Sequence, residues 1–584
     1  LIDFQIEKYP GSMSPSSYAS EVELIDKKEG LVMPYRIYMN HVLDYKGYRF
    51  FQSSYDTDEK GTILSVNHDP GTIITYIGYT LLFLGLIFHL FMPQSRFMKL
   101  IRLTKKVQKM RETMLVNMGI VLALFFTTNA ISNDNLPNDL KIVKSFSKEH
   151  AQKFKELLVQ DRDGRVEPID TLSRMILAKI TKKEEFLGLC ANQIFLGMTI
   201  RPDIWQKIEM IYVHHPKLKE LLGLKKDEKY APFKDFFKDD RYILEKYVQE
   251  AYLKKPAQRD QFDKEIIKVD ERVNVSYMVY TGDFLKIFPK PNDKNQKWYS
   301  PVEAIKSFEP KESELVRLIT ASYFSSIDEA LKSNDWTKAD KALEVIKDYQ
   351  KYYGASIIPP QRKIKAELLY NQLDIFNRLV PYYMIIGSIL LLLILANLIY
   401  PKIKIDYVIK IGLFFIIIGF LAHTFGLGLR WYVAGHAPWS DGYESMVYIA
   451  WAVVLAGFFF SKNSPIALSA TALLGGLILF VAHLNWLDPQ ITNLVPVLKS
   501  YWLMIHVSVI TASYGFLGLS ALLAFIVLIL YIFINKNNKD MLILTIKELT
   551  YTNEMSAIIG LILLTIGNFL GGVWANESWG QPAA

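Results

Sequence analysis

Eight apolar stretches constrain this chain more than any other feature of its sequence. A hydrocarbon layer about 30 Å thick needs roughly 20 consecutive apolar residues in a helix to cross it. We therefore expect a polytopic α-helical membrane protein with about eight transmembrane helices. The stretches cover residues 72–91, 115–131, 379–399, 408–429, 445–460, 464–483, 503–534 and 555–573.

The basic residues between these helices predict the orientation of the protein in the membrane. Residues 92–114 carry seven Lys and Arg residues against one acidic residue, which places them on the cytoplasmic side by the positive-inside rule. In the alternating topology that follows, the inside segments hold 14 basic residues, whereas the short outside loops 424–443 and 484–502 hold two. The net charge of +8 therefore reflects topology, and it indicates no nucleic-acid partner.

Topology and composition divide the chain into four parts. The first part, residues 1–71, alternates polar and apolar residues, with breaks at Lys46-Gly47 and Lys60-Gly61, as antiparallel strands do. The third part, residues 132–378, is rich in Lys, Glu and Leu at helical spacing. The expected parts are an extracytoplasmic β-rich segment (1–71), two transmembrane helices joined by the basic loop 92–114 (72–131), a large extracytoplasmic and mostly helical domain (132–378), and a transmembrane bundle with external Trp-rich loops (379–584).

The chain ends and the cysteine content narrow the possibilities further. The sequence starts at Leu1 without Met or a signal pattern and stops soon after a Trp-rich segment, so we expect a piece of a longer protein in which an upstream segment exports residues 1–71. Cys190 is the only cysteine, which excludes an intrachain disulfide and a C-x-x-C redox pair. A Gly-rich phosphate loop and an HExxH motif are also missing, so a nucleotidase or hydrolase is not indicated.

Tryptophan and histidine residues concentrate on the predicted outer side of the C-terminal helices. An interfacial aromatic belt, the simpler explanation, would appear at both membrane faces, yet the inner loops of this bundle contain no Trp. Neutral imidazole is a frequent axial ligand of haem iron, and indole rings suit a planar apolar macrocycle. We therefore favour an aromatic haem-binding surface, formed from Trp431, Trp439, Trp486, Trp502, Trp574 and Trp579 together with His423, His436, His483 and His506.

Five segments resemble a known family. Residues 430–445 (RWYVAGHAPWSDGYES), 499–507 (KSYWLMIHV) and 572–580 (GVWANESWG) are similar to the CcsA/ResC proteins of system II cytochrome c biogenesis, the last segment to the start of their "WWD" motif. Residues 9–18 (YPGSMSPSSY) and 48–56 (YRFFQSSYD) resemble the CcsB/ResB partner. With both halves in one chain, the sequence resembles the fused CcsBA family of bacterial cytochrome c synthases.

The resemblance implies an enzyme, a holocytochrome c synthase or haem–thiol lyase. Such a protein carries haem b, its substrate, to the outer face of the membrane and attaches the vinyl groups to the CxxCH thiols of apocytochrome c. It would lie in the bacterial cytoplasmic (inner) membrane as a multi-pass protein with large domains facing the periplasm. Besides haem and apocytochrome c, the implied partners are the lipid bilayer and a thiol-reducing thioredoxin-like protein.

By match of motif, His506 is implied as the catalytic residue and an axial ligand of the haem iron. The implied haem-binding residues are His506, Trp574, Asn576, Trp579, Trp439, His436 and Trp502. The other three haem-ligating histidines of the family have no match in this chain. Two alternatives stay open, a haem exporter or haem-binding membrane protein without ligation activity and a structural scaffold.

Overall fold

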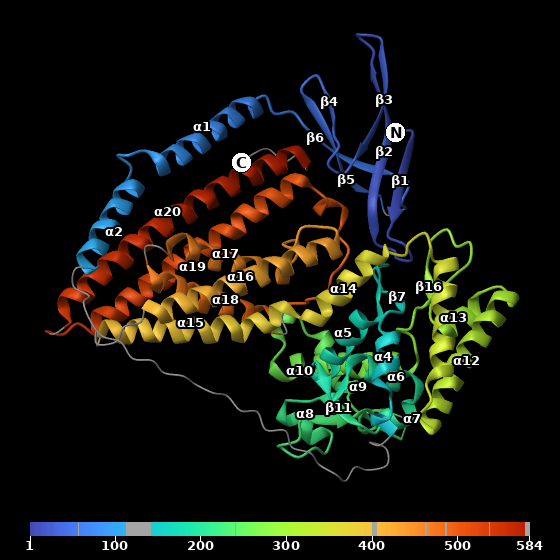
Figure 1. Cartoon of the computed structure of the whole chain (residues 1–584). Coiled ribbons are helices and arrows are strands. Elements are labelled where there is room, and N and C mark those ends of the chain that lie inside the picture. Colours follow the sequence, from blue (N-terminus) through green and yellow to red (C-terminus); the bar gives the residue numbers. More distant parts are fainter. Residues whose placement is uncertain are drawn as a thin grey trace. The chain divides into compact units, whose positions relative to one another are not determined.

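The described chain forms two compact units, each considered by itself (Figure 1). The computed structural model describes residues 1–56, 58–112, 142–239, 241–399, 406–461, 464–484, 487–536 and 538–578. The first unit contains the described parts of Leu1–Lys8, Ser14–Phe126 and Leu373–Ala584. The second contains those of Tyr9–Met13 and Thr127–Gln372. The predicted helix at 115–131 lies outside the described residues.

Two antiparallel three-stranded sheets form the N-terminal part of the first unit, in the orders β1-β2-β3 and β4-β5-β6. The turn between β4 and β5 is Lys46-Gly47, with φ of 49° and 83°. Two consecutive positive φ angles are typical of a two-residue hairpin turn, so the predicted strand break is confirmed. The strands are β1 (Asp3–Lys8), β2 (Pro15–Asp26), β3 (Leu31–Tyr38), β4 (Leu43–Tyr45), β5 (Tyr48–Tyr55) and β6 (Thr62–Asn67).

Long apolar helices make up the rest of the first unit. Their interfaces depend on small residues: a Cβ on Gly567 of α20 would lie 2.4 Å from Cγ1 of Ile510 on α19. Glycine therefore allows the close approach of these two helices, which run side by side in Figure 1. The helices are α1 (Thr72–Phe91), α2 (Arg96–Glu112), α15 (Ile375–Ile399), α16 (Asp406–Ala434), α17 (Gly442–Ser461), α18 (Pro465–Ala482), α19 (Tyr501–Ile532) and α20 (Lys539–Ser578).

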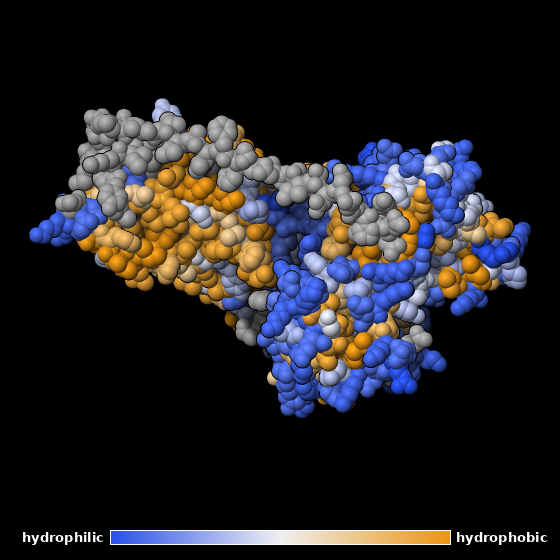
Figure 2. All heavy atoms as spheres, turned by 90° about the horizontal axis from the view of Figure 1, so that it is seen from below, coloured by the Kyte–Doolittle hydropathy of each residue, from blue (hydrophilic) through white to orange (hydrophobic). Residues whose placement is uncertain are grey.

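The surface of these helices is apolar, as a membrane-embedded surface must be. Figure 2 shows an apolar band over the bundle, and side chains such as Leu392 and Phe525 are 66% and 61% exposed. The prediction of a polytopic α-helical membrane protein is confirmed. Seven segments of the described chain are long and apolar enough to cross a membrane: Thr72–Met110, Gln361–Leu398, Tyr407–Ala434, Gly442–Ser461, Pro465–Ala482, Tyr501–Ile532 and Lys539–Ser578.

The basic segment 92–114, expected as a loop, contains the helix α2. Its apolar residues Phe97 and Leu100 are buried in a core that includes residues of α19 and α20. On the same helix, Nε of Arg96 lies 2.5 Å from Glu554 of α20. The helix therefore packs its apolar side on the bundle while its lysines remain polar surface.

The second unit is mostly helical, as predicted, with short two-stranded hairpins between the helices. Its core includes the buried side chains of Trp205 and Phe288 and the long helix α10. The helices are α4 (Lys148–Phe154), α5 (Ile169–Thr181), α6 (Ala191–Ile200), α7 (Pro202–Trp205), α8 (Pro216–Leu221), α9 (Glu245–Leu253), α10 (Gln261–Tyr280), α11 (Pro301–Ser307), α12 (Pro310–Ser333), α13 (Thr337–Tyr353) and α14 (Gln361–Leu373). The strands are β7 (Leu158–Gln160), β8 (Val166–Pro168), β9 (Glu185–Phe186), β10 (Leu189–Cys190), β11 (Glu209–Tyr212), β12 (Tyr230–Pro232), β13 (Phe237–Lys238), β14 (Arg241–Tyr242), β15 (Phe288–Pro289) and β16 (Trp298–Tyr299).

Candidate functional site

The candidate site lies at the end of the bundle where α19 begins and α20 ends, beside the two sheets. We call this the sheet-side end. Contacts across it include a hydrogen bond of 2.9 Å from the Asn40 side chain to the carbonyl oxygen of Lys499. The sheets and Lys499, just before α19, thus lie at the same end of the bundle.

His506, in the second turn of α19, is held on two sides. Its Nδ1 lies 3.0 Å from the carbonyl oxygen of Trp502, one turn earlier. Its ring stacks on the indole of Trp574 from α20, with centroids 5.2 Å apart and 28° between the planes. The residue is 8% exposed. The imidazole is therefore fixed both along its own helix and across the α19–α20 interface.

The second ring nitrogen of His506 remains available. Because Nδ1–H donates to a carbonyl oxygen, the lone pair of the neutral ring is on Nε2. Nε2 makes no hydrogen bond with the part of the chain that the structure describes. Gly571 of α20 faces this side of the ring: a Cβ there would lie 3.8 Å from Nε2 and 3.4 Å from Cδ2. Gly571 therefore places no side chain against this edge of the ring.

Trp439 connects the loop between α16 and α17 to the start of α19. Its indole N–H donates to the carbonyl oxygen of Met504, at 3.0 Å, two residues before His506. Its ring also packs against Trp431 and Tyr448, with centroid distances of 5.4 and 4.7 Å. The loop is thereby fixed to the turn of α19 that carries the histidine.

A buried ion pair stabilises the same loop. Nε of Arg430, on α16, lies 2.8 Å from Oε1 of Glu444, on α17, and their side chains are 1% and 0% exposed. Arg430 also donates to the carbonyl oxygen of Pro489, and the Glu444 carboxylate accepts from the backbone N–H of Ser440. Burial, together with the nearby Glu444 carboxylate, raises the pKa of Asp441 in this loop.

The Arg430–Glu444 pair was not predicted from the sequence, although both residues belong to the CcsA/ResC-like segment 430–445. Arg430 was predicted to lie in an outside loop, whereas the structure buries this guanidinium at the end of a membrane helix. A charge beside an apolar run costs free energy unless it is paired, so an Arg and a Glu flanking two such runs are the signal that could have revealed it.

The remaining predicted residues have varied surroundings. Trp502 is 38% exposed and contributes its carbonyl oxygen to His506. Both ring nitrogens of His436 lie 3.3 Å from carbonyl oxygens, those of Ala437 and Thr492. Asn576 is 2% exposed, and its side-chain amide is bonded to other side chains. Trp579 lies outside the described residues, and the haem-binding roles of all these residues stay predictions.

The four histidines do not form one cluster. The expectation that His423 lies at the outer end of a helix is wrong, because α16 continues to Ala434 and places His423 about 16 Å from that end. It is buried there, with Nε2 3.1 Å from the carbonyl oxygen of Val447. Nδ1 of His483 lies 2.7 Å from the carbonyl oxygen of Leu479. Among the described residues, no three His, Cys, Asp or Glu side chains are arranged to hold a metal ion.

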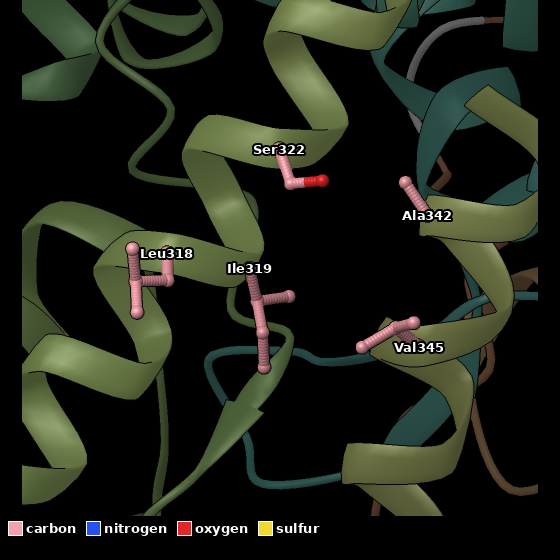
Figure 3. Close-up of a pocket in the computed structure, with 5 residues that line it drawn as sticks. All are labelled: Leu318, Ile319, Ser322, Ala342 and Val345. Carbon is pink, nitrogen blue, oxygen red and sulfur yellow. The ribbon is translucent and has the colours of Figure 1, made fainter. Parts of the chain in front are cut away.

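A cavity in the second unit offers less chemistry. It has a volume of about 210 Å³ and lies between α12 and α13 (Figure 3). Four aliphatic side chains and one hydroxyl group line it, from Leu318, Ile319, Ser322, Ala342 and Val345. Without a titratable or metal-ligating group, this lining has nothing with which to activate a substrate.

Comparisons with known proteins agree in placing two parts in this chain. Residues 439–584 match the model of the cytochrome C assembly protein family, and residues 1–63 match that of the ResB-like family. The first match covers Trp439, His506 and Trp574, and the second covers both sheets up to the start of β6.

Individual relatives match either nearly the whole chain or about a third of it. The chain is 44% identical to Protein NrfI of Wolinella succinogenes over 582 residues, which is 99% of this chain and 63% of NrfI. It is 33% identical to the cytochrome c biogenesis protein CcsA of Guillardia theta over 232 residues, 36% of this chain and 76% of that protein. A CcsA of Prochlorococcus marinus is 32% identical over 33% of this chain and 72% of its own length.

Proposed function

Because this chain belongs to the cytochrome c assembly family of CcsA and carries a ResB-like part in the same polypeptide, we propose that it is a haem–thiol lyase coupled to haem transport. Haem b would be its substrate, bound at the sheet-side end of α19 and α20. Apocytochrome c would be its second substrate. The sheets and the second unit would face the periplasm of a bacterium, with the bundle in the cytoplasmic membrane.

One observation carries this proposal, the arrangement of His506 between Trp502 and Trp574. A neutral imidazole with a fixed tautomer and an uncommitted Nε2 is the form of histidine that binds haem iron. The Nδ1 hydrogen bond also makes Nε2 a stronger donor to the metal. Gly571 places no side chain against this nitrogen, and we propose that a ligand approaches it from this side.

The chemistry asks the protein mainly for positioning. Each CxxCH thiol adds across one vinyl double bond, forming a C–S bond while the thiol proton passes to the other vinyl carbon, so no electron donor is consumed. His506 would hold the ring by its iron, and the Trp439 and Trp574 indoles would limit its orientation. Holding a thiol and a vinyl group within reach accounts for acceleration without a dedicated acid or base.

The apocytochrome thiols must be reduced before they can add to haem. Cys190 is the only cysteine of this chain, so the chain has no dithiol with which to reduce a substrate disulfide. A thioredoxin-like reductant is therefore part of the proposal. The proposed function also includes transport of haem across the membrane, and the same bundle would carry it out.

The test is co-expression of the protein with an apocytochrome c in cells that have no other cytochrome c maturation system. Covalent haem on denaturing gels is the expected result, and the His506→Ala variant should reduce it by about a hundredfold. His214→Ala, an exposed histidine of the second unit, is the matched control. Bound haem without covalent product would favour an exporter, and a full yield from His506→Ala without added imidazole would contradict the role of His506.

A further inference from the structure

The end of α20 is tied to the ResB-like part by a chain of polar contacts. The carboxylate of Glu577 forms an ion pair of 2.8 Å with Arg49 of β5 and accepts a hydrogen bond of 2.8 Å from the Tyr76 hydroxyl of α1. Arg49 is itself held by Asp44 of β4, at 2.7 and 3.1 Å. These contacts link residues about 500 positions apart, and they involve two strands and two helices.

Asn576 completes the chain of contacts. Its Nδ2 donates to the Tyr76 hydroxyl at 2.7 Å, and its Oδ1 accepts from the Asn67 side chain of β6 at 3.2 Å. With 2% of the residue exposed, both ends of this amide are used by protein groups. We name the set of Arg49, Asn67, Tyr76, Asn576 and Glu577 the sheet clasp.

The charges of the sheet clasp stabilise the ion pair between Arg49 and Glu577. Hydrogen bonding to Asp44 and the Glu577 carboxylate keep the pKa of Arg49 above its usual value, so the guanidinium is charged throughout the physiological range. Two parallel N–H bonds from Arg49 to Asp44 fix the direction of the guanidinium as well as its distance, and the Glu577 carboxylate adds an ion pair. The Arg49 side chain is 26% and that of Glu577 28% exposed, which shields the pair partly from water.

The sheet clasp lies directly beside the residues of the candidate site. Asn576 and Glu577 follow Trp574 on the same helix, so a rotation of this turn would move all three side chains together. Trp574 is the residue that stacks on the imidazole of His506. A further contact, the stacking of Tyr79 on Phe569 at 4.7 Å, fixes the preceding turn of α20 against α1.

We propose that Arg49 of the ResB-like part, Asn67 of β6 and Tyr76 of α1 are positioning residues that together set the rotation of the last turn of α20 and so keep Trp574 against His506. This inference rests on the proposed function, because it assigns a purpose to the clasp at a haem site. It gives the β-sheets a role in the chemistry: they orient the aromatic surface without touching the substrate. Asn576, which the sequence predicts to contact haem, would instead help to orient the aromatic surface from the side that faces the sheets.

The test compares single and paired variants in the full chain, purified from membranes. Arg49→Glu should lower the Soret absorbance per protein and the yield of holocytochrome c by about tenfold. The reason is that the introduced carboxylate and that of Asp44 would then both lie near Glu577 and repel it. Combining Arg49→Glu with Glu577→Arg restores an ion pair of the opposite direction and should recover both readouts to within about threefold of wild type. Tyr76→Phe removes only the bridging hydroxyl and should lower both readouts several-fold while the protein accumulates normally.

Arg36→Ala, which removes an exposed arginine of β3 that lies 3.5 Å from Glu21, is the matched control and should change neither readout. The inference is overturned if wild type binds haem and makes product while Tyr76→Phe and Arg49→Glu do so equally well. It is also overturned if the charge-exchanged pair accumulates but recovers nothing. A wild type that neither binds haem nor makes product would overturn the proposed function itself, and the inference with it.

Discussion

The sheet-side end of the bundle and the α4–α12–α13 corner of the second unit each contain a buried histidine, and the two are bound in different ways. Nδ1 of His150 lies 2.7 Å from Oδ1 of Asp340, and its Nε2 lies 3.0 Å from the Tyr323 hydroxyl. Within the described ranges of the chain, His506 makes a hydrogen bond through Nδ1 only. An imidazole with both nitrogens bonded inside the protein cross-links helices, whereas one with a free nitrogen can bind a ligand.

The comparison predicts opposite outcomes for alanine variants of the two histidines, and this is the largest effect we expect. His506→Ala should reduce haem per protein by about a hundredfold, since it removes the proposed iron ligand. His150→Ala should lower the amount of folded protein, because it removes the partner of the buried Tyr323 hydroxyl and leaves Asp340 with Lys153 alone, while haem per folded protein stays within about twofold of wild type. Soret absorbance divided by protein concentration measures both. Equal losses of haem per folded protein in His506→Ala and His150→Ala would contradict the proposed difference between the two histidines.

Gly571 offers a second test at the bundle. In Gly571→Leu, the side-chain carbons beyond Cβ would fill the approach to Nε2 of His506, so haem per protein should fall about tenfold. Gly571→Ala adds only a Cβ at ordinary contact distance, 3.4 Å from Cδ2, and should keep most of the haem. Gly428→Leu is the control, because a Cβ at Gly428 meets no atom within 4 Å. Haem retained in Gly571→Leu would show that ligands reach the imidazole from another side.

The buried Arg430–Glu444 pair predicts an effect on stability. Arg430→Met or Glu444→Leu alone leaves the other charge buried without its partner, which costs about 3–5 kcal/mol of unfolding free energy. The double variant should recover much of this loss, because two apolar side chains replace two charges. Thermal unfolding in detergent, followed by tryptophan fluorescence, measures the change. Single variants as stable as wild type would mean that water reaches the pair.

The smallest predicted effect concerns the pH dependence of the second unit. Burial lowers the pKa of His150, although Asp340 beside it acts in the opposite direction, and Lys153 and Lys347 add to the lowering. The unfolded chain then binds more protons than the folded one below pH about 6.5, so stability should decrease as the pH falls through this range. In His150→Gln this loss should be smaller by about 1 kcal/mol. Proteolysis of the full chain at pH 7.5 and 5.5 measures it, and an unchanged slope would contradict the assignment.

Local sequence patterns predicted much of the fold. Apolar runs identify the membrane helices because crossing a bilayer sets a minimum length, and alternation with a Lys46-Gly47 break identifies a hairpin because side chains alternate across a strand. In the same way, Phe97, Leu100 and Val107 are spaced as one face of a helix, although segment 92–114 was predicted to be a loop because of its charges.

Local sequence patterns did not predict which side chains contact one another. The motif resemblance singled out His506 and Trp574, which the structure brings into stacking contact. Sequence alone could not pair Asn576 with Asn67, because that contact depends on how elements about 500 positions apart pack together. The position of His423 was missed for a local reason: α16 extends beyond its apolar run through Arg430, whose charge the ion pair neutralises.

Magnetic circular dichroism of the purified full chain with ferric haem tests the central claim most directly. The account predicts the spectrum of an imidazole-ligated ferric haem for wild type. It predicts that this spectrum disappears in His506→Ala and returns when imidazole is added. A spectrum that is the same in wild type and His506→Ala would contradict the claim that His506 holds the haem iron.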